Sequence, residues 1–144
     1  MAYLTKDDIT THIYPEIRDE ITRGDDTLIT KAIITGVGMA KSYLNRYDLI
    51  KMFSDDDTLR TFSEEFLNSV VKDVICWHLI RLANPNINLE LFRQSYEDAI
   101  KFLEKVQRGG PDPAWPLKPD DPATPNDDAG NIMYVSFPKR INNY

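Results

Sequence analysis

Apolar residues recur at helical spacing through the first 109 residues, and this period constrains the fold most. Between residues 25 and 47 one set of apolar positions is Ile29, Ile33, Val37, Ala40, Leu44 and Tyr47. Their spacings of three and four place them on one face of a helix. The same period runs through residues 62–83 and 88–108, and no alternating strand pattern competes with it. The sequence therefore predicts an all-α fold, a small bundle of about four to five helices.

Capping residues and breaks divide this body into elements. Thr61 and Glu64 have the spacing of a capping box, which predicts that the helix over 62–83 begins there. Residues 52–60, with three consecutive aspartates, are expected to form a loop before it. Gly109 follows the last periodic residues, where a left-handed cap commonly ends a helix.

Proline usage changes abruptly after Gly109. Six of the nine prolines lie between residues 111 and 125, among several aspartates. We therefore expect a helical domain over 1–109 and an extended Pro/Asp-rich C-terminal tail over 110–144. Such a composition is typical of disorder, yet the tail also carries large apolar side chains, so ordering on a partner is an equal alternative. The candidate partner-binding residues are Trp115, Ile132, Tyr134, Phe137, Lys139, Arg140 and Tyr144.

The charge balance argues against several classes of partner. Seventeen basic and 23 acidic residues give a formal net charge of −6, which disfavours a broad nucleic-acid-binding surface. The opening residues resemble neither a signal nor a transit peptide, and no charge-free stretch approaches the roughly 20 residues that span a bilayer. We expect an intracellular protein with no membrane segment and no specific nucleic-acid site.

No motif predicts catalysis, metal binding or a cofactor. Cys76 is the only cysteine, so an intrachain disulfide and a multi-cysteine zinc site are excluded. His78 stands two residues away on the same expected helix, where the two side chains point to different faces and cannot form a catalytic pair. Gly36 and Gly38 lie in a sequence without the P-loop spacing, and close packing by a crossing helix explains them better. We expect a protein that is not an enzyme.

Several segments of the body carry a family resemblance. Residues 3–9 read Tyr-Leu-Thr-Lys-Asp-Asp-Ile, and residues 32–47 form a long expected helix that ends in the signature Tyr-Leu-Asn-Arg-Tyr at residues 43–47. These segments resemble the opening and the long helix of the Mu-like phage head–tail connector family, the small helical neck proteins of tailed phages and prophages. Residues 73–82 match its next buried helix, and residues 96–103 with Gly109 match its closing helix. The resemblance covers about residues 2–109. The two glycines of the long helix and the long, Pro-rich tail depart from the family pattern.

The resemblance implies a structural, head-completion role without catalytic residues. Connectors of this family close the filled head and join the portal protein to later neck or tail proteins, commonly as homo-oligomeric rings. It therefore implies a place in the virion neck after assembly in the host bacterial cytoplasm. Within the signature, we expect Arg46 to pair with a carboxylate and Tyr47 to pack. Two alternatives stay open: a stand-alone helical protein–protein interaction module with a C-terminal recognition arm, and an enzyme whose site forms only on oligomerisation.

Overall fold

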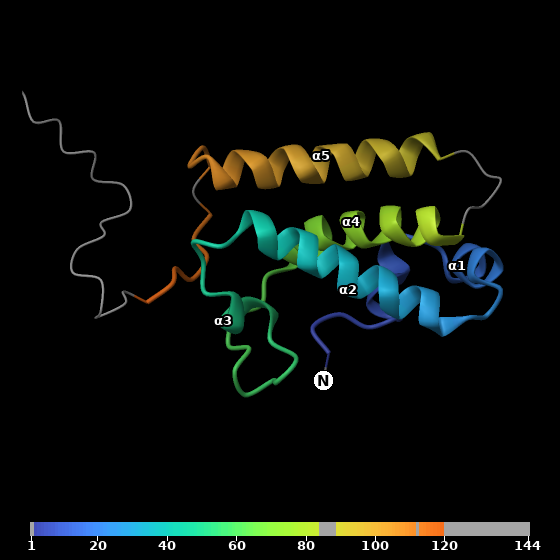
Figure 1. Cartoon of the computed structure of the whole chain (residues 1–144), viewed down its shortest axis with the longest axis horizontal. Helices are drawn as coiled ribbons and strands as arrows, with labels where there is room; N and C mark the ends of the chain where they lie inside the picture. The colour runs from blue at the N-terminus through green and yellow to red at the C-terminus, as the bar shows by residue number, and fades with distance from the viewer. Residues whose placement is uncertain (1, 84–88, 112, 120–144) are drawn as a thin grey trace, which may run out of the picture.

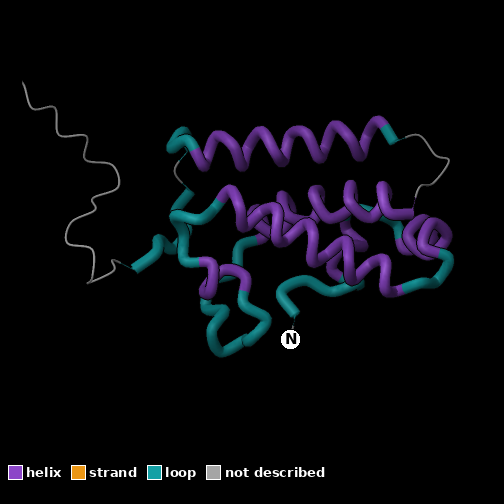
Figure 2. The backbone as a smooth tube through the Cα atoms, in the orientation of Figure 1, coloured by secondary structure: helices purple, strands orange, loops and turns teal. Residues whose placement is uncertain are grey.

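The described part of the chain is helical, as the sequence predicts. The computed structural model describes residues 2–83, 89–111 and 113–119 (Figure 1). Its elements are η1 (Asp8–Thr11), α1 (Pro15–Thr22), α2 (Asp26–Tyr43), α3 (Leu49–Phe53), α4 (Glu65–Ala83) and α5 (Glu90–Gln107). Figure 2 shows helices and loops, and within these residues the only β pairing is an isolated antiparallel bridge between Tyr47 and Leu117. The all-α prediction is confirmed.

Helix α4 forms the centre of the bundle. Its buried side chains include Val71, Val74, Ile75, Leu79 and Ile80, which face in several directions around the helix. A helix that is apolar all round needs neighbours on more than one side. Accordingly, α4 packs against both α2 and α5, and α5 runs alongside it in Figure 1. This arrangement makes α4 the element on which the others are positioned.

The two glycines of α2 have different surroundings. A Cβ atom at Gly36 would lie 2.5 Å from Cγ1 and 3.0 Å from Cα of Ile75, so only glycine allows α2 and α4 to approach this closely. Around a Cβ at Gly38, in contrast, no atom of the described residues lies within 4 Å. The expected close packing is confirmed at Gly36, and it does not explain Gly38.

Three of the expected boundaries differ in the structure. Helix α2 ends at Tyr43 rather than near residue 47, the short α3 overlaps the start of the loop expected over 52–60, and α4 begins at Glu65 rather than near residue 62. The Asp48 carboxylate starts α3 by accepting a hydrogen bond from the Lys51 N–H at 3.2 Å. Helix α4 begins at Glu65, and no Thr61–Glu64 capping box precedes it, because the Glu64 carboxylate accepts a hydrogen bond elsewhere, from the indole of Trp115. At Gly109 the positive φ of 83° matches the expected left-handed cap.

Residues 113–118 pack on the helical body. The Asp48 N–H donates to the Pro116 carbonyl at 2.8 Å, and the Lys118 N–H donates to the Arg46 carbonyl at 3.1 Å. Trp115 is only 5% exposed, and its ring meets that of Tyr47 edge-on at 5.6 Å between centroids. The packed part of the chain therefore extends past the boundary expected at residue 109.

Candidate protein-interaction site

An open groove of about 630 Å³, here called the α2 groove, runs between the N-terminal segment and α2. Three parts of the chain line it, and its lining residues are Ala2, Tyr3, Leu4, Thr5, Lys6, Thr30, Ile33, Ile34, Val37, Gly38, Lys41, Phe53 and Asp55. The α2 residues recur at intervals of three and four, so one face of this helix forms the floor. The sequence pattern placed two of these residues, Ile33 and Val37, on the core face of the helix, and it did not indicate a groove.

Specific contacts hold the N-terminal wall of the groove in place. The Tyr3 N–H donates to Asp55 Oδ1 at 3.1 Å, and the Tyr3 hydroxyl donates to Asn68 Oδ1 at 2.6 Å. The Tyr3 ring meets Phe53 edge-on at 5.0 Å between centroids, and Leu4 is buried. Burial raises the pKa of the Tyr3 phenol well above its usual range, so the hydroxyl remains a donor. The N-terminal wall is thus anchored both to Asp55, in the loop after α3, and to Asn68 of α4.

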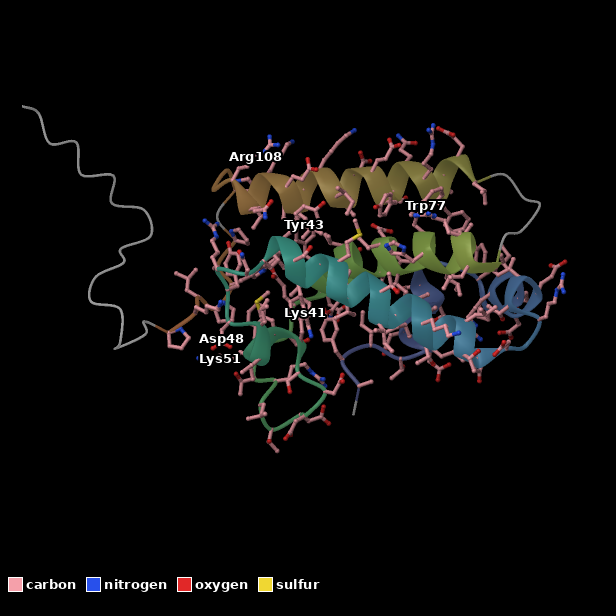
Figure 3. All side chains as sticks on the ribbon, in the orientation of Figure 1. Lys41, Tyr43, Asp48, Lys51, Trp77 and Arg108 are labelled. Carbon is pink, nitrogen blue, oxygen red and sulfur yellow. The ribbon has the colours of Figure 1, made fainter. Side chains whose placement is uncertain are left out.

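The floor of the groove is apolar and its rim carries cations. Ile34 is 67% exposed, a high value for an isoleucine on a helix that belongs to the core. Four residues later Gly38 leaves the floor open. The Lys41 ammonium lies 5.9 Å from the centroid of the Phe53 ring, on the α3 side of α2 (Figure 3). Lys6 forms an ion pair of 2.7 Å with Asp26. Such a surface suits an apolar segment of another protein.

A second surface, here called the His12 cleft, lies where η1 and α1 meet α4 and α5. It encloses about 370 Å³ and shares no residue with the α2 groove. Its lining residues are Thr10, Thr11, His12, Ile13, Tyr14, Ile17, Asp73, Cys76, Leu91, Phe92 and Ser95. Tyr14 and Leu91 are 72% and 71% exposed, so two large side chains on this surface leave most of their apolar area in water.

Polar groups in the His12 cleft are held by one another. The imidazole Nδ1 of His12 lies 2.8 Å from Thr11 Oγ1, and its Nε2 lies 3.0 Å from Ser69 Oγ and 3.7 Å from Asp73 Oδ1. Burial, followed by the charge of Lys72, lowers the pKa of His12, so the imidazole is neutral at pH 7. Burial, followed by the charge of Asp98, raises the pKa of Asp73 to about 6. The His12–Asp73 contact is therefore not an ion pair at neutral pH.

Cys76 has the properties of a buried structural thiol. It is 2% exposed, and burial raises the pKa of its thiol to about 12, which leaves almost no thiolate at neutral pH. His78 lies on another side of α4, where its Nε2 is 3.4 Å from Met39 Sδ and its ring is near that of Tyr96. The two residues are kept apart, as their spacing on the helix predicts.

The expected partner-binding residues fall into two groups. Trp115 belongs to the core, because its ring packs on Tyr47 and Phe102 and its indole N–H donates to Glu64, which leaves only 5% of the residue exposed to a partner. The others lie outside the described residues: Ile132, Tyr134, Phe137, Lys139, Arg140 and Tyr144.

Arg46 differs from its expectation. Its guanidinium donates to the hydroxyl of Tyr47 at 2.8 Å and lies 5.0 Å from the centroid of that ring, and no carboxylate among the described residues forms an ion pair with it. Tyr47 is fully buried, as expected. Both residues therefore support the corner between α2 and α3.

Sequence reasoning missed the residues that form the two surfaces, chiefly Ile34, Gly38, Tyr14 and Leu91. Two clues were present. Ile34 lies outside the apolar stripe that contains Ile29, Ile33 and Val37, and a second glycine in one helix calls for its own explanation. Both clues become interpretable only when the neighbours of α2 are known.

The described residues offer no candidate for a metal site or a membrane-spanning helix. Across residues 2–83, 89–111 and 113–119, no three His, Cys, Asp or Glu side chains gather to hold a metal ion. No helix in this part of the structure has the length and apolar character to cross a membrane.

No family model, curated protein or solved structure matches this chain.

Proposed function

We propose that this chain is a structural subunit of a phage or prophage head–tail connector, which closes the filled head and joins the portal to neck or tail proteins as a ring. The observation that carries the proposal is the pair of separate apolar surfaces, the α2 groove and the His12 cleft, on one helical body. A ring forms through heterologous contacts, in which each copy meets its two neighbours through different surfaces. The resemblance of residues 2–109 to the connector family supports a place for this ring in the virion neck.

The properties of the body suit this role. Helix α4 has neighbours on several sides, so the subunit is a close-packed body that can present fixed surfaces to its partners. Weak contacts between single copies add up once many copies assemble on one portal, because each bound copy raises the effective concentration of the next. The net charge of −6 disfavours binding to the DNA that passes through the channel. The role requires no catalytic residue.

Electron microscopy of the full-length protein mixed with its cognate portal tests this proposal. We expect a ring of this protein bound to one end of the portal. Leu91→Asp, at the edge of the His12 cleft, should abolish the ring because it places a charge on a large exposed apolar side chain. Leu59→Asp is the matched control, since Leu59 is also exposed but lies on neither surface. A portal that binds no copy of the wild-type protein would refute the connector role.

A further inference from the structure

Gly38, in the α2 groove, has no packing role among the described residues. A glycine inside a helix lowers stability by about 1 kcal/mol relative to alanine. Gly36 has a structural reason in Ile75, but Gly38 has no neighbour among the described residues, and its backbone does not require glycine. Ile34, one turn earlier, is largely exposed on the same side. A floor that is open at Gly38 and apolar at Ile34 allows the close approach of another backbone.

We infer that the α2 groove binds residues 131–144 of a second copy of this chain. The inference names a contact between copies for the ring proposed above and rests on that proposal only for the existence of a ring. It also gives the C-terminal anchors Ile132, Tyr134 and Phe137 a specific site on the neighbouring copy.

The length and composition of the segment match the groove. Five of the six residues from Ile132 to Phe137 are apolar, and in extended form the stretch spans about 17 Å, at about 3.3 Å per residue. The floor from Thr30 to Lys41 also spans about 17 Å, because a helix rises about 1.5 Å per residue. The length and the apolar character of the segment therefore match those of the floor.

The spacer before this segment is long enough to reach a second copy. Residues 120–130 contain two prolines and four aspartates, and such a stretch spans up to about 35 Å when extended, at about 3.1 Å per residue. A body of this size has a diameter of about 35 Å, which is also the spacing of adjacent copies in contact. The groove of the same chain also lies within reach, because Phe53 is six residues from Tyr47, the partner of Leu117. Docking within one chain would leave the protein monomeric, so the association state distinguishes the two arrangements.

Two full-length variants test the contact by complementation. Gly38→Leu fills the groove while leaving residues 131–144 intact, and Tyr134→Asp/Phe137→Asp removes the anchors while leaving the groove intact. Thr35→Leu is the control for the first, because it adds the same side chain to an exposed α2 position outside the groove. Circular dichroism should show that all three remain folded, since leucine is a good helix former and positions 35 and 38 are exposed.

Sedimentation velocity over a concentration series gives the readout. The wild type and Thr35→Leu should associate, and each of the two variants alone should associate at least about tenfold more weakly. An equimolar mixture of the two should form one-to-one pairs, because the intact C-terminal segment of one binds the intact groove of the other. Wild-type protein that stays monomeric, variants that associate like wild type, or a mixture that fails to pair would each overturn the inference. If the anchor variant still forms a ring on the portal, the inference fails while the connector role stands.

Discussion

The two glycines of α2 provide a matched test of the packing described here. Gly36→Ala adds a methyl group 2.5 Å from Cγ1 of Ile75, about 1 Å less than two carbon atoms normally keep. Because the Cα of Ile75 is also only 3.0 Å away, a change of rotamer cannot relieve the clash, and α2 must move away from α4. Overpacking of this kind lowers stability by about 1–3 kcal/mol, of which the better helix propensity of alanine returns about 1 kcal/mol.

Gly38→Ala receives the same gain in propensity and meets no atom of the described residues. We therefore expect Gly36→Ala to lower the free energy of unfolding by up to about 2 kcal/mol and Gly38→Ala to raise it by about 1 kcal/mol. The two variants should then differ by about 1–3 kcal/mol, or about 3–9 °C in Tm.

Urea unfolding followed by circular dichroism measures this difference, at concentrations below those at which copies associate. The midpoints should move in opposite directions with unchanged m-values. If Gly36→Ala is stabilised as much as Gly38→Ala, then α2 and α4 do not approach closely at Ile75, and the packing described here is wrong.

Three further predictions each concern one side chain. Trp115→Ala should lower the free energy of unfolding by about 3 kcal/mol in urea titrations, and a loss below about 0.5 kcal/mol would show that residue 115 is not part of the core. Burial, followed by the charge of Asp98, raises the pKa of Asp73 in the native state to about 6. As the pH rises from about 4 to about 6, Asp73 ionises in the unfolded chain but stays largely protonated in the native state, so the native state loses stability. Asp73→Asn should therefore stabilise the protein at pH 7 and change little at pH 4 in thermal melts, and an equal effect at both would contradict this. Because burial raises the pKa of Cys76 to about 12, a thiol reagent at pH 8 should label it only after denaturation, and rapid labelling of the native protein would disprove that.

Much of the helical fold could be predicted because its determinants are local. The period of apolar residues follows from the geometry of one helix, and Gly109 ends α5 through its own positive φ. The end of α2 was placed too late because Leu44 and Tyr47 keep the helical spacing although the helix has ended. Both are fully buried, so their spacing reports contact with the core rather than continued helix. The five-residue α3 is shorter than any periodicity can reveal.

The surfaces and the packing of Trp115 depend on contacts between distant parts of the chain. Proline and aspartate around Trp115 predict an exposed tail, and the indole ring was the only local indication of a core position. Its partner Glu64 is 51 residues away, and Tyr47 and Phe102 come from two other segments. Likewise, the openness of the α2 groove at Gly38 depends on where residues 2–6 lie. No local pattern encodes such relations.

The docking of residues 113–118 determines where a pulling force would enter the molecule. Two main-chain hydrogen bonds, from Asp48 and Lys118, join this segment to the corner between α2 and α3 in antiparallel orientation. Tension applied beyond residue 119 along the segment runs across these bonds and shears them together, while the buried Trp115 ring resists withdrawal. The force therefore reaches the corner between α2 and α3 before it reaches the end of α5. These contacts would therefore resist a partner that pulls on the chain beyond residue 119 before the force acts on the packing of the helices.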